Sequence, residues 1–523
     1  MSYDLTDIAG IGKATADKMK AAGIDSIAKL ANVNPDELIK LKIKGVGAAT
    51  AKKYITNAKK LYQEIGAQEE PKSKVKVISK VKPELEPKSK PKPKPKSKTK
   101  ASNIKELIKK QAECNIGLVG HVDHGKTTLV KTLTGDWTDR HSEEQERGIS
   151  IKLGYSNATI LYCPNCDEYI TYYLAEKSRE KGQPRYLCPQ CKEQLEFRRN
   201  ISFVDAPGHE ILMATMLSGA SLMDGACLLI AADERCPQPQ TREHLEALHI
   251  AGIKNIIIIQ NKIDAVSREQ ALENYQQIKE FIKGTIAENA PIIPISAVFG
   301  ANIDLIIRAF EEIIPSPKLP EGEFQFLIAR SFDINRPGKE ISDLKGGVIG
   351  GSVLKGMIKI GDQIEIRPGL RVKDEYIPLK STVVSISQGS NLLDNAKPGG
   401  LIGLGTNLDP ALTKGDHLIG NLVGKPDTLP EILHEIEFKV NLLDRVIGSE
   451  QMLRVHSLKH NEKLLLVVGT EKTGGTVTKI LKDSVIIKLN PPICPAEDFI
   501  FAISRIINRR YRLIGYGETV DNN

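Results

Sequence analysis

The eight residues from Gly120 to Thr127 have the types and the spacing needed to hold a phosphate group. Their sequence, GHVDHGKT, fits the pattern G-x4-G-K-[ST]. In such a loop the glycines let backbone N–H groups point inward, and the helix that follows adds positive potential. The lysine would reach the β- and γ-phosphates, and the threonine hydroxyl would hold Mg²⁺. The loop predicts phosphate contacts from Asp123, His124, Gly125, Lys126, Thr127 and Thr128.

A second short pattern, DAPGH at Asp205–His209, follows the apolar run Ile201–Val204. A carboxylate at this place can bind the hydration shell of Mg²⁺, so Asp205 is expected to act through water. The backbone N–H of Gly208 can meet the γ-phosphate. Taken alone, D-x-x-G is also found in ordinary turns.

Two further patterns indicate which base is bound. Asn261–Asp264 reads NKID after the apolar run Ile256–Gln260. A carboxylate there can accept from both N1–H and N2–H of guanine, donors that adenine does not offer, so GTP is favoured over ATP. A backbone N–H after the run Ile292–Ile295 could meet guanine O6. The expected base contacts are Asn261, Lys262, Asp264, Ser296, Ala297 and Val298.

Four of the eight cysteines form two C-x2-C pairs separated by 21 residues: Cys163, Cys166, Cys188 and Cys191. Two such pairs can close a tetrahedral Zn²⁺ site. Four thiolates leave no open position, so the metal would be structural. The alternative is that one or both pairs are reduced thiols without a metal.

The elements that must position these residues follow from the apolar pattern. Ile116–Val119 and Ala226–Ala231, with the three runs named above, read as buried parallel strands. Helical stretches separate most of them, which is the βαβ pattern of a doubly wound sheet. In open sheets of this kind ligands bind at the carboxyl ends of the strands, where all these motifs fall.

The chain is long enough for several domains. After Glu323, short β-rich runs alternate with Gly, Pro and Asn-Asp turns, which predicts two β-barrels. We expect a multidomain chain of a small all-α unit, an α/β P-loop GTPase domain with a zinc knuckle at about 160–195, and these barrels. The expected bounds are 1–65 for the helical unit, 66–103 for a Lys/Pro-rich linker, 104–318 for the G domain, and 319–427 and 428–523 for the barrels.

Charge is concentrated in one segment. The chain is 41% hydrophobic and 26% charged with a formal net charge of +8, but residues 71–100 hold twelve Lys and two Glu, so the remainder carries a net −2. This segment could contact nucleic-acid phosphates or be a solvated linker. No stretch approaches the roughly 20 apolar residues of a membrane span, and no signal peptide is evident, so we expect a cytoplasmic protein.

Taken together, GHVDHGKT, DAPGH, NKID and SA in this order resemble the translational GTPases of the elongation factor Tu type. The resemblance narrows to the gamma subunits of archaeal and eukaryotic initiation factor 2. It does so through HSEEQERGIS at 141–150, the cysteine insertion, PQPQTREH at 237–244 and KGGVIGG at 345–351. It extends from about Asn115 to the end of the sequence.

This resemblance implies a GTPase that binds GTP or GDP and, with alpha and beta subunits, delivers methionylated initiator tRNA to the small ribosomal subunit. GTP hydrolysis would be linked to start-codon selection. Mg²⁺ would be held by Thr127 and Ser150, and a second Mg²⁺ by Asp123 and the carbonyl of Gly148. His209 would position the attacking water. Ser150 departs from the usual threonine, which keeps the hydroxyl but loses the methyl group that restricts its rotamer.

For the tRNA end, the resemblance implies a cleft between the G domain and the first barrel. Tyr155 would stack on the terminal adenine, and Lys345, Gly346 and Gly347 would lie close to it. A basic and aromatic cluster at 505–512 could contact RNA, but such a pattern is at least as often a solvated barrel face.

The first residues carry a different resemblance. Two G-h-G turns, at Gly10–Gly12 and Gly45–Gly47, resemble a tandem helix-hairpin-helix domain. In that family hairpin N–H groups bind nucleic-acid phosphates without reading sequence. Lys13 and Lys44 suit such a role, so this domain and the Lys-rich linker could contact RNA. A protein-docking module or a spacer is an equal alternative.

Two other functions stay open. A selenocysteine-specific elongation factor would carry tRNA in the same way, but further domains are expected after its second barrel, whereas this sequence ends at Asn523. A nucleic-acid-binding scaffold with a GTP switch would use the N-terminal domain and the basic linker instead. Selective binding of charged initiator tRNA in the GTP state would separate these readings.

Overall fold

The computed structural model describes most of the chain after residue 100. The described residues are 5–8, 11–21, 24, 30, 50, 51, 53–58, 101–137, 153–207, 213–317, 320–335, 338–373, 375–446, 453–496 and 499–519. Backbone contacts divide the chain into two compact units, Met1–Pro95 and Lys96–Asn523. None of the described helices has the length and apolar character needed to cross a membrane.

The first unit is helical where it is described. It contains the 3-10 helix η1 (Leu5–Asp7) and helix α1 (Lys13–Ala21), and residues 53–58 are also helical. Its small apolar core includes Leu5, Met19 and Ala58, all fully buried. Gly10 and Lys44 lie outside the described residues, so the phosphate-binding hairpins stay a prediction.

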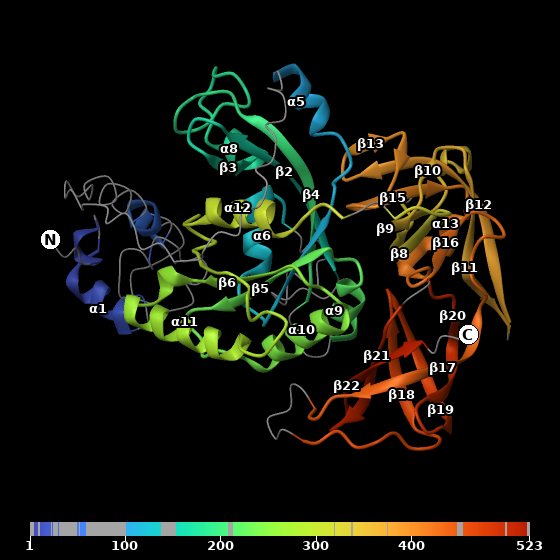
Figure 1. Ribbon diagram of the computed structural model, residues 1–523. Helices are drawn as coiled ribbons and strands as arrows, with labels where there is room; N and C mark the ends of the chain where they lie inside the picture. The colour runs from blue at the N-terminus through green and yellow to red at the C-terminus, as the bar shows by residue number, and fades with distance from the viewer. Residues whose placement is uncertain are drawn as a thin grey trace, which may run out of the picture. The chain divides into compact units, whose positions relative to one another are not determined.

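The G domain is built on one seven-stranded sheet (Figure 1). The strand order is β3-β2-β4-β1-β5-β6-β7, and the five strands from β4 to β7 in this order are parallel, which confirms the predicted doubly wound sheet. The antiparallel edge strands β2 and β3 were not predicted. The strands are β1 (Asn115–Gly120), β2 (Gly154–Cys163), β3 (Glu168–Thr171), β4 (Glu196–Asp205), β5 (Gly225–Ala231), β6 (Ile256–Asn261) and β7 (Ile292–Pro294).

Helices cover both faces of this sheet, because its central strands are apolar on both sides. Helix α12 shows the pattern: Ile303, Ile306 and Phe310 are spaced for one face and are buried on the sheet. Ser267 and Gln270 form a capping box that starts α11. The helices are α5 (Ala101–Leu107), α6 (Lys126–Thr134), α8 (Tyr172–Lys177), α9 (Met213–Ala220), α10 (Pro239–Ile250), η3 (Ile263–Ala265), α11 (Arg268–Ile282) and α12 (Ile303–Ile313).

Domain II is a closed six-stranded antiparallel barrel, as predicted. The ring runs β11-β16-β8-β9-β15-β12 and is closed by pairing of β11 with β12. Strand β13 extends the sheet beside β12, and β10 pairs with β14. The elements are β8 (Gln325–Phe332), η4 (Ile341–Asp343), β9 (Val348–Lys355), β10 (Ile358–Lys359), β11 (Gln363–Val372), β12 (Glu375–Gln388), β13 (Asn391–Leu393), β14 (Asn395–Ala396), β15 (Leu401–Thr406), α13 (Pro410–Thr413), η5 (Lys414–Asp416) and β16 (Leu422–Gly424).

Domain III is a second closed barrel of six strands in the order β17-β20-β19-β18-β21-β22. Phe438 and Phe501 stack in its core with ring centroids 5.2 Å apart, and both are fully buried. The strands are β17 (Leu433–Leu442), β18 (Lys463–Val468), β19 (Glu471–Ile480), β20 (Val485–Ile493), β21 (Phe501–Ile507) and β22 (Arg510–Thr519).

Domain III packs directly against the G domain. Val467, Ala502 and Leu513 belong to the same buried apolar cluster as residues of α9 and α10. Within this contact the buried hydroxyl of Ser218 donates to the carbonyl of Thr470 at 2.9 Å. The barrel is therefore fixed to helices that also border the nucleotide site.

Two adjacent glycines of β9 offer a matched test of barrel packing. A Cβ on Gly351 would lie 1.9 Å from the carbonyl oxygen of Leu327, whereas a Cβ on Gly350 would have no neighbour closer than 3.7 Å. We expect Gly351→Ala to destabilise the protein by about 1–3 kcal/mol, because backbone must move to admit the methyl group. Gly350→Ala should leave thermal stability nearly unchanged. Equal melting temperatures for the two variants in calorimetry would contradict this packing.

Candidate nucleotide and metal sites

The motif residues meet at the carboxyl edge of the parallel strands. Strand β1 lies between β4 and β5, so the phosphate loop begins beside Asp205, the last residue of β4. Strand β6 lies next to β5 and ends at Asn261. The sequence prediction that these segments share one edge is confirmed.

Thr127 and Asp205 form the centre of the site. The threonine hydroxyl donates to a carboxylate oxygen of Asp205 at 2.7 Å. Two hard oxygen donors this close suit a small divalent cation such as Mg²⁺. Gly148, Ser150, Gly208 and His209 lie outside the described residues, so their expected parts in the site stay predictions.

Lys126 is held inside the loop. Its ammonium group donates to the carbonyl of Gly120 at 2.9 Å and to that of His121 at 2.7 Å. The side chain is 6% exposed, so the loop backbone wraps around it. To contact phosphates, the ammonium group must exchange at least one of these carbonyls for a phosphate oxygen.

Asn261 ties three segments together. Its Nδ2 donates to the carbonyl of His124 at 2.9 Å, and its Oδ1 accepts from the backbone N–H of Ala297 at 3.0 Å. Thr132 donates to the Ala297 carbonyl at 2.8 Å and to the carbonyl of Thr128 at 3.0 Å. The side chain of Asn261 thus fixes the relative position of the phosphate loop and the predicted base loops rather than pointing to solvent.

Asp264 and Val298 of the base loops are accessible, whereas Ser296 is buried. Asp264 is exposed, and Val298 is 72% exposed. Lys262 has a positive φ of 62°, and its ammonium group pairs with Asp233 at 3.1 Å. The Ser296 hydroxyl accepts from the N–H of Phe299 at 3.2 Å, which closes the turn after β7. This geometry leaves the carboxylate of Asp264 open to a base.

Two histidines, His124 and His244, support the phosphate loop from behind. The sequence predicted only a nucleotide contact for His124 and no role for His244. His244 on α10 is buried, and its Nδ1 accepts from the backbone N–H of Gly120 at 2.8 Å. Burial holds the pKa of His244 well below its usual value, so the ring is neutral and can accept. His124, predicted to line the phosphates, is buried instead, with Nδ1 2.8 Å from the Leu229 carbonyl and Nε2 3.3 Å from Glu234.

The residue before His244 faces another domain. The Glu243 carboxylate accepts from the guanidinium of Arg512 on β22 at 2.9 Å, and both side chains are largely buried. Burial raises the pKa of Glu243 to about 7, with Arg512 opposing the shift. In the sequence, the motif PQPQTREH indicates only the family resemblance. No sequence signal pairs Glu243 with Arg512, which lies 269 positions later.

The four predicted cysteines come together in the insertion between β2 and β4. All four Sγ atoms lie within 4.8 Å of one another, with Cys163 and Cys191 at 3.4 Å and Cys166 and Cys188 at 3.8 Å. Four thiolates about 2.3 Å from one zinc ion would lie about 3.8 Å apart. The backbone N–H of Glu193 lowers the pKa of Cys191 to about 6, whereas burial raises the pKa of Cys163. The cluster fits a tetrahedral metal.

The residues expected near the tRNA end have internal partners. Tyr155 is half-buried against the G-domain core. Burial raises the pKa of its hydroxyl, and Arg330 and Asp416 of domain II shift that pKa in opposite directions. A Cβ on Gly346 would lie 1.9 Å from the carbonyl oxygen of Thr406. A Cβ on Gly347 would meet the side chain of Thr413 at 2.4 Å. These glycines are needed for packing within the barrel, and a role toward tRNA stays a prediction.

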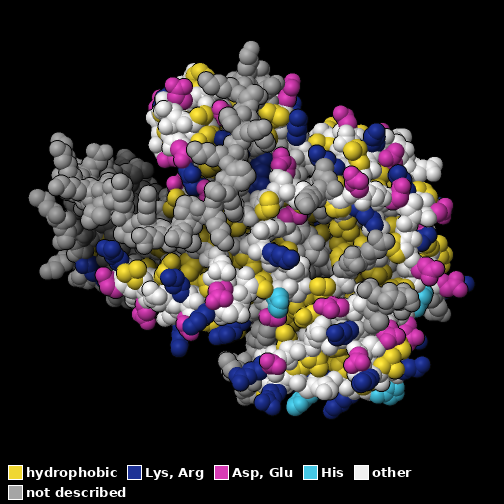
Figure 2. All heavy atoms as spheres, viewed as in Figure 1, with side chains coloured by type: hydrophobic (Ala, Val, Ile, Leu, Met, Phe, Trp, Pro, Cys, Tyr) yellow, Lys and Arg dark blue, Asp and Glu magenta, His cyan; other side chains and the backbone are white. Residues whose placement is uncertain are grey.

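Lys345 and the C-terminal arginines are also placed by local contacts. The backbone of Lys345 exchanges two hydrogen bonds with the side chain of Asn335. Arg505 pairs with Glu462, and Arg512 pairs with Glu243, so two members of the basic cluster are used within the protein. Positive and negative side chains are interspersed over the face drawn in Figure 2.

Family models match three parts of the chain. Residues 111–316 match the elongation factor Tu GTP binding domain. Residues 434–519 match the C-terminal domain of initiation factor eIF2 gamma, and residues 2–60 match a SAM-like helix-hairpin-helix tandem. The helix-hairpin-helix resemblance of the N-terminal unit is thereby confirmed.

Whole-chain relatives are closely similar. Translation initiation factor 2 subunit gamma of Pyrococcus horikoshii is 56% identical over 413 residues, which are 78% of this chain and 97% of that protein. The protein of the same name from Methanocaldococcus jannaschii is 57% identical over the same shares.

Solved structures share the fold at lower identity. A bacterial selenocysteine-specific elongation factor superposes with a TM-score of 0.59 at 23% identity, and the match spans 78% of this chain but 58% of that one. The elongation factor SelB of Methanococcus maripaludis, solved with a GTP analogue, superposes with a TM-score of 0.56 at 23% identity. At this identity the likeness concerns the fold alone.

Substitution of His244 should weaken nucleotide binding. His244→Ala removes the acceptor of the Gly120 N–H and leaves that buried donor unpaired, so we expect about tenfold weaker GDP binding. His249→Ala is the matched control, because His249 lies on the same helix with its side chain half exposed. Fluorescent GDP titration gives the dissociation constants, and thermal melting confirms folding. Equal affinities for the two variants would show that His244 does not brace the loop.

Proposed function

The chain belongs to the gamma-subunit family of translation initiation factor 2 and is a translational GTPase, and from this premise we propose that it carries methionylated initiator tRNA. In this proposal it delivers the tRNA to the small ribosomal subunit, and hydrolysis of GTP to GDP and phosphate is linked to start-codon selection. The observation that carries the proposal is the geometry of the sheet edge. There the hydroxyl of Thr127 donates to the carboxylate of Asp205, an oxygen pair that suits a divalent cation, and Asn261 holds the base loop against the phosphate loop.

The phosphates would be bound by the loop and by the segment after β4. Lys126 would exchange its carbonyl partners for β- and γ-phosphate oxygens, and the N–H of Gly208 would meet the γ-phosphate. Asp123, His124, Gly125 and Thr128 would contribute backbone contacts. His124 suits only this use, since its ring is buried behind the loop.

Guanine would be selected by the exposed carboxylate of Asp264, which can accept two hydrogen bonds from its edge. Lys262 would cover one face of the base, with its stem held by the ion pair to Asp233. The backbone N–H groups of the Ser296, Ala297 and Val298 turn would approach O6. Asn261 would position these loops and not contact the base through its side chain.

The hydroxyl of Thr127 and, through water, the carboxylate of Asp205 would hold Mg²⁺, with Ser150 joining them in the GTP state. When bound, this ion supplies charge that neutralises the phosphates during transfer. Asp123 and the carbonyl of Gly148 would hold a second Mg²⁺. His209 would orient the attacking water. The chain's own contribution to catalysis would be positioning, since phosphoryl transfer needs little covalent help.

The acceptor end of the tRNA would lie between the G domain and domain II. In this proposal Tyr155 stacks on the terminal adenine, and Lys345, Gly346 and Gly347 lie close to it. The buried hydroxyl of Tyr155 has no hydrogen-bond partner among the described residues.

The name of the relatives, subunit gamma, implies a multi-subunit factor, so alpha and beta subunits are the proposed partners. The helix-hairpin-helix unit and the Lys-rich linker, residues 66–103, would add RNA contact. The protein would act in the cytoplasm. The domain bounds predicted above stay predictions, as does the choice of RNA over a docking role for the N-terminal unit.

Binding of tRNA tests the proposed function. Charged initiator, charged elongator and uncharged initiator tRNA are presented to the chain with a GTP analogue or GDP in filter binding. Only charged initiator tRNA with the analogue should be retained. In the Asp264→Ala variant, retention should no longer depend on the analogue, because the contact with guanine is lost. Retention of all three tRNAs would favour the nucleic-acid-binding scaffold. Preference for selenocysteinyl-tRNA would favour the elongation-factor alternative.

Metal content tests the cysteine cluster, where we propose structural Zn²⁺. Protein purified under reducing conditions should contain about one zinc per chain. The double variant Cys163→Ser/Cys191→Ser should contain none and should melt at a lower temperature, because metal binding stabilises the folded insertion. Cys236→Ser is the control, since Cys236 lies outside the cluster. Wild-type protein without zinc in elemental analysis would remove this proposal.

A further inference from the structure

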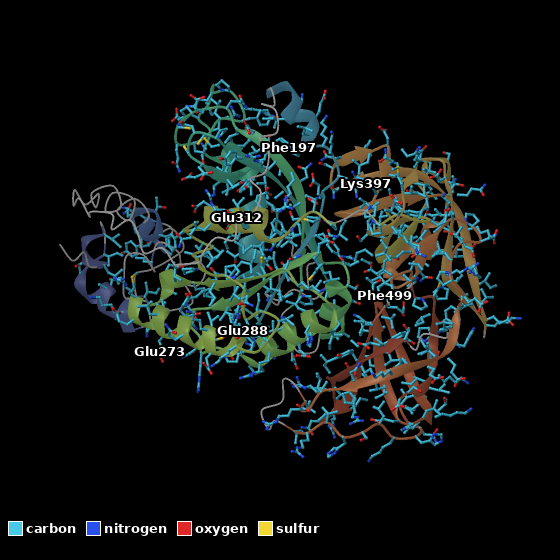
Figure 3. All side chains as sticks on the ribbon, viewed as in Figure 1. Phe197, Glu273, Glu288, Glu312, Lys397 and Phe499 are labelled. Carbon is cyan, nitrogen blue, oxygen red and sulfur yellow. The ribbon has the colours of Figure 1, made fainter. Side chains whose placement is uncertain are left out.

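The segment between α5 and β1, residues 108–114, contacts two domains at once. It precedes the first strand of the G domain, yet its side chains and backbone reach domain II. Figure 3 labels Lys397, which lies on the domain II side of this contact. None of these residues belongs to the nucleotide or metal sites.

Both the Nε2 and the Oε1 atoms of Gln111 form hydrogen bonds with a turn of domain II. Its Nε2 donates to the carbonyl of Lys397 at 2.6 Å and also to the carbonyl of Gly399. Its Oε1 accepts from the backbone N–H of Lys397 at 3.1 Å. One side chain therefore satisfies three backbone groups of the turn that leads into β15.

Gln388 makes the reciprocal contact from the barrel. It ends β12 and is 5% exposed. Its Oε1 accepts from the backbone N–H of Ala112 at 2.7 Å, and its Nε2 donates to the carbonyl of Leu401 at 3.2 Å. The buried amide thus joins the segment before β1 to the first residue of β15.

The two backbones are also in van der Waals contact. A Cβ on Gly399 would lie 2.5 Å from the carbonyl oxygen of Glu113, and one on Gly400 would lie 2.7 Å from the Cβ of Ala112. Only glycines allow this approach. Of the hydrogen bonds at this contact, the one from Ala112 to Gln388 is buried, whereas those between Gln111 and Lys397 lie nearer the surface.

The same segment is anchored to the G domain by Asn200 of β4. The side-chain Nδ2 of Asn200 donates to the carbonyls of Leu107 and Lys110, each at 2.8 Å. Its backbone carbonyl accepts from the N–H of Glu113 at 2.8 Å. Its Oδ1 accepts from the hydroxyl of Thr159 on β2 at 2.6 Å. The segment is therefore fixed to the sheet independently of domain II.

This contact lies along the same side of β2 as the junction proposed for the tRNA end. Tyr155 and Asn157 both belong to β2, and Asn157 lies against Gly389, the residue after Gln388. A cavity of about 160 Å³ opens between the domains here, lined by residues that include Asn157, Asn200, Gln388 and Asn391. The segment before β1 bridges the two domains beside that cavity.

We propose that residues 111–113, with Gln388, act as a latch that fixes domain II against the G domain in the orientation that receives charged initiator tRNA. Gln111 and Gln388 are positioning residues, because they set the width of the cleft without touching nucleotide. The functional part of the proposal rests on the proposed tRNA binding. The latch itself is a property of the two domains.

The test uses the full chain with Gln388→Ala and Gln111→Ala. Gln183→Ala is the matched control, because among the described residues the side-chain amide of Gln183 hydrogen-bonds only to Glu180, far from domain II in the sequence. We expect about tenfold weaker binding of charged initiator tRNA for Gln388→Ala, as for a lost buried hydrogen bond. Affinity for GDP should not change. Backbone amide exchange at 397–401 should become faster in both variants and not in the control.

A double variant shows whether the two glutamines act together, since their combined effect on tRNA affinity should be less than the product of the single effects. Gln111 is more exposed than Gln388, so the Gln111→Ala variant can still be tested if Gln388→Ala fails to fold. Faster exchange at 397–401 with unchanged tRNA affinity would overturn the positioning role. If wild-type chain binds no charged initiator tRNA, the proposed function fails, and unchanged amide exchange would separately overturn the latch.

Discussion

Parallel pairing of β1 with β4 and β5, and of β5 with β6, is the constraint on which the rest of the structure depends. Backbone hydrogen bonds in this ladder fix the register of four strands, so their last residues must reach the same edge. That edge brings Gly120, Asp205 and Asn261 together although they are far apart in the chain. Side chains then refine an arrangement that the backbone has already imposed.

The sequence could predict what depends on local pattern. Asp205 and Asn261 each follow an apolar run, so their place at the sheet edge followed from the strands, and cysteine spacing predicted the four-sulfur cluster. His244 and Glu243 could not be assigned, because their partners Gly120 and Arg512 are 124 and 269 positions away. The close approach of Gly346 to the carbonyl oxygen of Thr406 could not be assigned either, because the two residues are 60 positions apart. The antiparallel strand β2 was missed because Gly154, Ser156 and Asn157 break the apolar run in its first half, and only Ala158–Leu161 is continuously buried.

The two barrels are attached to the G domain by different chemistry. Domain III shares an apolar cluster with α9 and α10, so burial of side chains from both domains holds it in place. Domain II meets the segment before β1 through amide groups and glycine backbone, with a cavity beside the contact. Hydrogen bonds are directional and apolar contacts are not. Domain III therefore combines a large apolar contact with a buried ion pair, whereas the contact of domain II with the segment before β1 consists of directional amide hydrogen bonds.

Helix α10 touches the phosphate loop and domain III through neighbouring residues, His244 and Glu243. Adjacent positions on a helix point about 100° apart, since one turn takes about 3.6 residues. Loss or gain of a single residue between Pro239 and Glu243 would rotate both side chains away from their partners at once. The first turn of this helix must therefore keep a fixed residue count if both contacts are to form.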